Sequence, residues 1–274
     1  MLREITLLSL GVLAGVLIAG CSSAGQIVEP RYVIGLEQVQ LQSEPNWSEY
    51  TVRQRDTTAG VQTVYRDSTW EVRFYPSGGA ISMKATNRSE SIIRVQVQDG
   101  LYIGPESSPQ ELVTGEMSYS ARNASPRPTI LRPSGGGAAD LIPLEHVSFF
   151  PKTGVSLDRT FFPPSLIATM EDVEKARSNV GKSFSLVLPV ETRASTRQYR
   201  FGFSVKDVIL PPDQAIQALL SGTVTKGIHK SYVRQIKGEP RFTDTRDGRL
   251  VWYYGTMTDR TRIFFEDDHV VEIW

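Results

Sequence analysis

The sequence has a single cysteine, Cys21, among its 274 residues. One cysteine cannot form a disulfide within the chain, so a disulfide framework is excluded as a source of stability. Charge of one sign is also missing, because 30 lysines and arginines balance 30 aspartates and glutamates. A neutral chain lacks the basic surface on which nucleic-acid binding depends, so we expect no nucleic-acid partner.

Sequence motifs that carry chemistry are absent as well. There is no His-Glu-x-x-His, Cys-x-x-Cys, EF-hand or Gly-x-Ser-x-Gly pattern. The glycines at 135–137 are not followed by the Lys-Ser/Thr of a phosphate-binding loop. Asp140 and Glu145 could serve as paired catalytic carboxylates, but nothing distinguishes them from other acidic residues, so surface or loop roles are the favoured interpretation. We therefore expect a protein that is not an enzyme.

Histidine is scarce, with only His146, His229 and His269. His269 follows the acidic run 266–268, which is compatible with either a metal site or a solvated hairpin turn. Four consecutive turn residues rarely converge on one ion, so the turn is the favoured interpretation. We predict no metal site.

The longest apolar run lies at the N-terminus, from Ile5 to Ala19. It is too short to cross a roughly 30 Å hydrocarbon core comfortably and has the size of a signal-peptide core. The run ends with a branched apolar residue, two small residues and Cys21, in the order Ile18-Ala19-Gly20-Cys21. The alternatives are an ordinary secretory signal or a single-span anchor with an incidental cysteine.

This ending resembles the lipobox of bacterial lipoproteins. The resemblance implies that residues 1–20 are a signal peptide, that diacylglyceryl and N-acyl lipid are attached to Cys21, and that no other cofactor is bound. Residues 21–31 would form a lipidated tether, and the lipid would make the membrane a partner. Lipoproteins of this type carry an inner-membrane retention signal as an aspartate after the cysteine. Ser22 and Ser23 stand there instead, which implies an outer-membrane lipoprotein of the cell envelope, on the periplasmic face or the cell surface.

Residues 32–210 have the pattern of a β-sandwich. Residues 70–75 and 80–85 predict a hairpin around the turn 76–79, and residues 198–208 alternate strictly between apolar and polar side chains. Further strands are expected at 33–41, 92–97, 141–150 and 183–190, with one helix near 170–180. The glycines at 135–137 and the prolines within 126–133 predict long surface loops. The fold class is therefore mostly β, beginning with an antiparallel sandwich.

This region is similar to the immunoglobulin-like sandwiches of bacterial surface lipoproteins. The segments that carry the resemblance are Lys84–Ser89 and Gly181–Leu186, each in front of a β pattern. The aromatic and charged strip Trp70–Tyr75 has two interpretations. It is either a glycan- or peptide-binding surface or a strand with one core face and one wet face.

Composition changes at Pro211-Pro212, which marks a domain boundary. Residues 213–220 and 229–236 predict two helices, and residues 250–254, 261–265 and 270–274 predict a three-stranded meander. Residues 213–274 are therefore expected to form a small α+β domain.

This layout resembles the BamE/SmpA-type domain (SmpA/OmlA) of outer-membrane lipoproteins. The positions that match its pattern are Gly222, Gly227, Val233, Gly238, Pro240, Trp252, Tyr253, Phe265 and Val270. Gly238 would end the second helix through a positive φ, and Trp252 or Tyr253 would cover the helices. The same two-helix and sheet shape is also similar to that of β-lactamase inhibitor proteins.

Taken together, these resemblances imply a membrane-anchored lipoprotein that acts as a non-enzymatic scaffold or protein-interaction component of the envelope. Other envelope proteins would be its partners, and outer-membrane protein assembly is one setting for this role. Two alternatives stay open: an envelope hydrolase acting on a cell-wall polymer, and a peptide- or glycan-binding surface lipoprotein. Trp274 is either an interface anchor at a sheet edge or a core aromatic of its domain.

Overall fold

The computed structural model describes residues 28–41, 49–57, 60–105, 108–117, 127–150, 154–256 and 258–274. The protein is mostly β, with 54% strand and 14% helix. Cys21 and the expected signal peptide lie outside the described residues. Among the residues that are described, no helix is long and apolar enough to cross a membrane. The chain divides into two compact units, Ile27–Leu220 and a C-terminal one with Ser221–Trp274.

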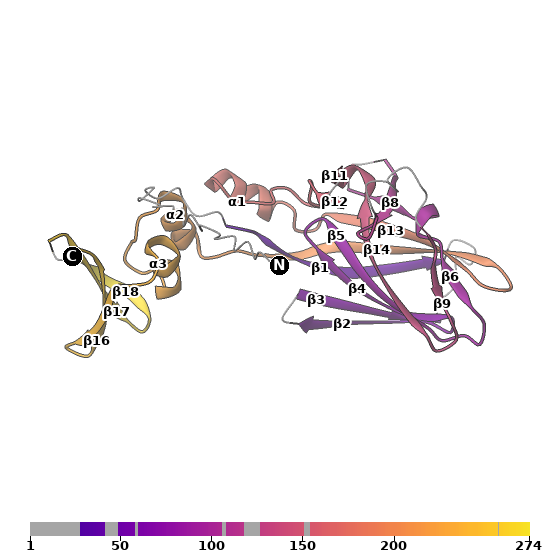
Figure 1. Cartoon of the computed structure of the whole chain (residues 1–274), viewed down its shortest axis with the longest axis horizontal. Helices are drawn as coiled ribbons and strands as arrows, with labels where there is room; N and C mark the ends of the chain where they lie inside the picture. Colours follow the sequence, from indigo (N-terminus) through magenta and orange to yellow (C-terminus); the bar gives the residue numbers. More distant parts are fainter. Residues whose placement is uncertain are drawn as a thin grey trace, which may run out of the picture. The chain divides into compact units, whose positions relative to one another are not determined.

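The N-terminal unit is built around a large antiparallel sheet (Figure 1). Its strands are β1 (Arg31–Leu41), β2 (Thr51–Thr57), β3 (Gly60–Arg66), β4 (Trp70–Ser77), β5 (Ala80–Asn87), β6 (Ile93–Val95), β7 (Leu101–Ile103), β8 (Gln110–Thr114), β9 (Thr129–Leu131), β10 (Gly136–Pro143), β13 (Ser183–Glu191) and β14 (Thr196–Ile209). Their order is β1-β14-β13-β7-β8-β10-β5-β4-β3-β2, with β6 beside β13 and β9 beside β6. A separate hairpin pairs β11 (Val147–Phe150) with β12 (Gly154–Leu157).

The core lies where side chains of β4 meet those of β14. The rings of Trp70 and Tyr199 are 5.3 Å apart, and Phe74 lies 4.8 Å from Phe201 and 5.4 Å from Phe203. All five side chains are fully buried. The sheet therefore folds into two layers around an aromatic core. The core interpretation of the strip 70–75 is correct, and a binding surface made by Trp70 and Phe74 is excluded.

A buried carboxylate links β3, β4 and β14 at one end of this core. Asp67 accepts hydrogen bonds from the backbone N–H groups of Thr69 at 2.7 Å and Trp70 at 2.8 Å. The hydroxyls of Tyr65 and Tyr199 donate to its other oxygen, both at 2.9 Å. Burial raises the pKa of both tyrosine hydroxyls well above the ordinary value, and the negative charge of Asp67 raises it further. The phenols therefore stay protonated and act as donors to this carboxylate.

The prediction of a glycine loop at 135–137 is wrong for Gly136 and Gly137, which belong to β10. Gly136 pairs with Thr86, and Gly137 pairs with Ala85 on β5. A Cβ at Gly137 would lie 2.8 Å from methyl groups of Leu131 and Thr129 on β9. A larger residue at Gly137 would have to displace these two methyl groups, because another strand packs closely against it.

The single strand expected at 141–150 is also interrupted. Strand β10 ends at Pro143, a 3₁₀ helix covers Leu144–His146, and β11 begins at Val147. The expected helix near 170–180 is present as α1 (Met170–Arg177) and begins with a capping box between Thr169 and Asp172. The interruption at 144–146 turns His146 inward, where its side chain is buried.

Helix α2 (Asp213–Ser221) lies at the end of the N-terminal unit, with only Ser221 in the C-terminal unit, and α3 (Lys230–Lys237) belongs to the C-terminal unit. These are followed by β15 (Phe242–Arg246), β16 (Arg249–Gly255), β17 (Arg260–Glu266) and β18 (His269–Ile273). The four strands form one antiparallel sheet in chain order. The prediction of a three-stranded meander is therefore wrong. Strand β15 was missed because none of its side chains is buried, so it has no apolar face to reveal it.

Glycines and aspartates occupy the left-handed turns of this unit. Gly238 has φ +79° at the end of α3, and Asp247 and Gly248 have φ +51° and +79° in the β15–β16 hairpin. In the β17–β18 hairpin, Asp267 and Asp268 have φ +46° and +65°. Aspartate tolerates this conformation better than most residues, so the turn forms without glycine.

Candidate functional site

The two faces of the C-terminal sheet differ in what covers them. On one face Trp252, Ile263 and Phe265 are almost fully buried. The guanidinium of Arg234 on α3 lies 5.0 Å from the ring of Trp252. Of the two aromatic candidates for covering the helices, Trp252 is therefore the one that contacts α3. Val233 of α3 and Val270 of β18 are buried too.

The opposite face carries a row of large side chains across all four strands. Phe242 pairs with Tyr253, and Tyr253 pairs with Arg262. Arg262 and Trp274 exchange backbone hydrogen bonds of 2.8 and 2.9 Å. Directly opposed residues of antiparallel strands point to the same face. Phe242, Tyr253, Arg262 and Trp274 therefore form one continuous row, called the outer row below.

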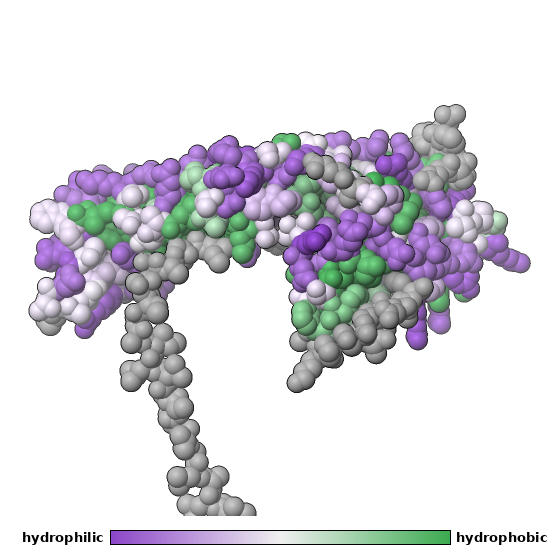
Figure 2. All heavy atoms as spheres, turned by 90° about the horizontal axis from the view of Figure 1, so that it is seen from above, coloured by the Kyte–Doolittle hydropathy of each residue, from purple (hydrophilic) through white to green (hydrophobic). Residues whose placement is uncertain are grey.

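The ends of the outer row are open to solvent. Phe242 is 60% exposed and Trp274 is 67% exposed, whereas Tyr253 between them is only 4% exposed. Trp274 is therefore not a core aromatic, and that interpretation of the sequence is wrong. Its ring lies 6.4 Å from that of Phe264, the nearest aromatic along the same face. Figure 2 shows hydrophobic residues of the C-terminal unit reaching the surface among hydrophilic ones.

Arginines surround the centre of the outer row. Arg246 and Arg260 place their guanidinium groups 5.8 and 6.0 Å from the ring of Tyr253, within the range of cation–π attraction. Arg246 is paired with Asp244 at 3.2 Å. No ion pair within the described residues involves Arg260 or Arg262. Arg260 and Arg262 are therefore available to form ion pairs with a partner, although Asp244 and Glu272 lie on the same face.

A small cavity opens beside Tyr253. It has a volume of about 330 Å³ and is lined by Arg241, Phe242, Tyr253, Tyr254, Gly255 and Arg260. The hydroxyl of Tyr253 is buried and has no hydrogen-bond partner among the described residues. Aromatic and arginine side chains around a small cavity are the composition of a protein-binding hot spot.

Sequence reasoning found Tyr253 and Trp274 but missed Phe242 and the arginines beside it. The sequence signal for them is the turn Arg246-Asp247-Gly248, which directly precedes the first predicted strand. An Asp-Gly pair with both φ angles positive is typical of a tight hairpin, which requires a strand on each side. Reading that turn as a hairpin would have predicted β15 and Phe242.

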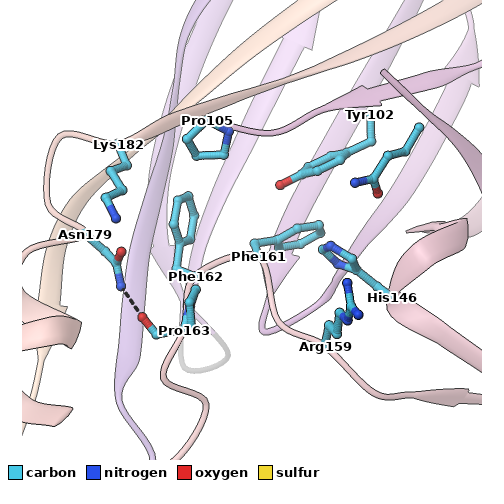
Figure 3. Close-up of a pocket in the computed structure, with 10 residues that line it drawn as sticks. Tyr102, Pro105, His146, Arg159, Phe161, Phe162, Pro163, Asn179 and Lys182 are labelled. Atoms are coloured by element: carbon cyan, nitrogen blue, oxygen red, sulfur yellow. Dashed lines mark hydrogen bonds between the residues drawn. The ribbon is translucent and has the colours of Figure 1, made fainter. Parts of the chain in front are cut away.

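A second concave site lies in the N-terminal unit, next to the 3₁₀ helix that ends at His146 (Figure 3). Its volume is about 420 Å³, and His146, Gln110 and Arg159 lie in its wall. Burial is the main cause that lowers the pKa of His146. The positive charge of Arg159 lowers it further, and Glu145 partly opposes the shift. His146 is therefore neutral at pH 7.

This histidine should make the stability of the N-terminal unit dependent on pH. Its pKa is lower in the folded chain than the ordinary 6.5, so below about pH 6.5 the unfolded chain takes up the proton first. Stability is then lost progressively as the pH falls below that value. Between about pH 7.5 and about pH 5.5, His146→Phe should lose less stability than the parent protein does. Urea unfolding at both pH values measures this, and an unchanged pH dependence in the variant would contradict it.

The remaining candidates have local partners. His229 accepts from the backbone N–H of Ser231 at the start of α3, and Asp268 pairs with Lys230 at 2.6 Å. Within the described residues, no three His, Cys, Asp or Glu side chains are grouped so as to hold a metal ion. Asp140 accepts from Ser82 at 2.5 Å, and Glu145 accepts from Gln110 at 3.2 Å. The structure gives these two carboxylates separate partners.

The glycines of the BamE/SmpA-like pattern shape the backbone and do not present side chains to a site. Gly222 and Gly227 have positive φ angles of +66° and +87°. The carbonyl of Gly238 accepts from the hydroxyl of Tyr254 at 3.1 Å, just before Pro240. These glycines shape the ends of helices and loops. Comparison of the whole chain with protein-family models, curated proteins and solved structures found no match.

Proposed function

We propose that the protein is a lipid-anchored, non-enzymatic component of the cell envelope that binds another protein through the outer row. The exposure of Phe242 and Trp274 on either side of Tyr253 is the observation that carries this proposal. Aromatic side chains at a surface are costly to leave solvated and are enriched where proteins dock. Attachment to the outer membrane through Cys21 would hold this face near envelope partners.

The chemistry of the face defines the partner. The cavity beside Tyr253 accepts one apolar side chain, and Arg241 and Arg260 border it. A carboxylate next to that apolar side chain would pair with an arginine, since Arg260 has no ion pair within the described residues. The partner is thus an envelope protein that presents an apolar side chain beside an acidic one.

We also propose a fold family for each of the two units. The C-terminal unit would be a variant of the BamE/SmpA-like domain, supported by α3 packing against the sheet and by the glycine positions. It departs from that layout by the additional strand β15. The N-terminal unit would be an immunoglobulin-like sandwich, supported by two antiparallel layers around one aromatic core. Pro211-Pro212 would begin the connection between the two domains, whose compact units divide between Leu220 and Ser221.

A double variant tests the docking surface. Phe242→Ser with Trp274→Ser removes both exposed aromatics; neither side chain is itself buried, although Phe242 also contacts the ring of Tyr253, with ring centres 5.4 Å apart. We expect the variant to stay folded. Its affinity for the partner should fall at least about tenfold, because hot-spot truncations typically cost 2 kcal/mol or more of binding free energy. Chemical crosslinking in intact cells, followed by mass spectrometry, measures the loss of the partner.

The matched control is Ile130→Ser with Phe150→Ser. These two side chains are also exposed, at 57% and 47%, but belong to the N-terminal unit. The control should retain the crosslinked envelope protein. Equal crosslinking by the parent protein and the outer-row variant would refute the proposed surface.

A further inference from the structure

The solvent-facing side of strands β2 to β5 carries five exposed cations. These strands are neighbours in one layer of the N-terminal unit (Figure 1), and every second residue of β4 points away from the aromatic core. Opposed residues on neighbouring strands lie on the same face, so the registers place all five cations on one side of the layer. They form the basic face, which consists of Arg53, Arg55, Arg66, Arg73 and Lys84.

Carboxylates are fewer than cations on this side of the layer. Glu71 lies opposite Arg66 and pairs with Arg73 at 2.9 Å. Asp140 lies on β10 at one border of the face and accepts from the hydroxyl of Ser82. The other cations of the basic face take part in no ion pair within the described residues, namely Arg53, Arg55, Arg66 and Lys84. The face therefore keeps a net positive charge, although the chain as a whole is neutral.

The centre of the basic face is a pair of like charges. Arg73 is directly opposed to Lys84 across β4 and β5, and like charges in that position destabilise a sheet. The apolar part of the same layer is treated differently, because the hairpin β11–β12 packs against Ile142 of β10 and Val113 of β8. The fold thus covers the apolar part with its own hairpin and leaves the basic part exposed.

The composition of the basic face fits a surface of phosphate groups. Four of its five cations are arginines, whose planar guanidinium groups bind phosphate oxygens in pairs. Protein-binding sites are depleted of charge at their centres, whereas the centre here is Arg73 beside Lys84. Lipid phosphate is therefore favoured over a protein as the partner of this face.

The length of chain before the first described residue limits the distance to the membrane. Cys21 lies seven residues before Val28, and seven extended residues span about 25 Å at most. A lipid on Cys21 would therefore keep the N-terminal unit near lipid phosphates. Each cation near an anionic membrane strengthens binding about fivefold. A few such cations do not hold a protein alone, but they can orient one that lipid already tethers.

We propose that the basic face lies against the anionic phospholipid surface in which Cys21 is anchored. The arginines would contact lipid phosphates, and the cost of opposing Arg73 and Lys84 would be offset there. This proposal rests on the lipid anchor of the proposed function, but it does not depend on the outer row. It assigns the side of the N-terminal unit that faces the membrane.

The test measures which side of the lipidated protein meets the membrane in reconstituted vesicles. Cys21 is the only cysteine and would be acylated, so an introduced cysteine is the only thiol that takes a fluorescent label. Thr86→Cys places the label beside the basic face, opposite Glu71. Gln40→Cys is the control position, because Gln40 is exposed on β1 and pairs with Arg200 in the other layer.

Lipids with a spin label on the headgroup quench a fluorophore that lies at the membrane surface. In vesicles of equal parts phosphatidylglycerol and phosphatidylcholine, we expect stronger quenching at position 86 than at position 40. The difference should be lost in vesicles of phosphatidylcholine alone. It should also be lost at about 1 M NaCl, where the Debye length falls to about 3 Å.

Charge removal tests the residues themselves. Arg53→Gln with Lys84→Gln, in the Thr86→Cys background, should lower the equilibrium constant for membrane contact about 25-fold, at about fivefold for each cation. Lys175→Gln with Arg193→Gln removes the same charge from exposed positions on α1 and in the β13–β14 turn, and should leave the quenching unchanged. Lys84→Gln relieves the opposed pair, so the unfolding temperature in detergent should not fall.

Two results overturn the proposal and leave the anchor intact. One is equal quenching at positions 86 and 40, and the other is quenching at position 86 that neither phosphatidylglycerol nor the double variant alters. Vesicle flotation and mass spectrometry of the N-terminal peptide report on the anchor separately. A protein without acyl groups that does not float with phosphatidylcholine vesicles contradicts the anchor, and this proposal with it.

Discussion

Replacing Asp67 with alanine is expected to lower the free energy of unfolding of the N-terminal unit by about 3–5 kcal/mol. The carboxylate is 3% exposed and accepts four hydrogen bonds, two from backbone N–H groups and two from tyrosine hydroxyls. Alanine would remove the acceptor that these four donors share, and the two backbone N–H groups would lose it inside the aromatic core. Each unpaired donor costs about 1–3 kcal/mol before the structure relaxes, and relaxation recovers part of the sum.

Urea unfolding followed by tryptophan fluorescence measures this loss, since Trp70 lies directly beside the site. Asp67→Asn keeps one acceptor oxygen and the shape of the side chain, so it should lose less than half as much. Tyr65→Phe and Tyr199→Phe should each cost about 1–2 kcal/mol, and their effects should largely vanish in the Asp67→Ala background. A loss below about 1 kcal/mol for Asp67→Ala would show that this network does not stabilise the fold.

Replacing Cys21 with serine is expected to abolish lipid attachment completely. In the proposed anchor, the Cys21 thiol would be the nucleophile that accepts the diacylglyceryl group, and a serine hydroxyl would not replace it. The variant should accumulate as the uncleaved precursor and incorporate no radiolabelled palmitate. Mass spectrometry of the N-terminal peptide and metabolic labelling both measure this.

Ser22→Asp is the matched control for the anchor. The cysteine is unchanged, so this variant should be lipidated and cleaved as the parent is. In a host with two membranes, the aspartate should keep it in the inner-membrane fraction, as the retention signal of such lipoproteins does. A parent protein without palmitate, or a Cys21→Ser variant that matures normally, would disprove the anchor.

Strands with one buried face were predictable from the sequence, and strands without one were not. The alternation of Tyr199, Phe201 and Phe203 revealed β14, because all three side chains enter the core. Strand β15 has no buried side chain, so its composition does not distinguish it from a loop. The glycines at 136 and 137 were taken for a loop for a similar reason. Their role depends on Leu131 and Thr129, which approach only in the folded chain.

The candidate sites were predictable only in part. Tyr253 and Trp274 were named from the sequence, because a large aromatic in a short strand is visible there. The cavity beside His146 was not, since the burial of His146 and Gln110 is a property of the fold. The neighbours of Gln110 come from segments that are distant in sequence, and Glu145 is one of them. No local pattern connects these residues.

Photo-crosslinking from the outer row in intact cells tests the central claim most directly. A photoreactive phenylalanine analogue is placed at Phe242, where the side chain is 60% exposed, and separately at Phe150 in the N-terminal unit as the control position. We predict a discrete crosslink to one envelope protein from position 242 and none of that product from position 150. A protein shown to be lipidated and folded that yields no envelope-protein crosslink from position 242 would contradict the account.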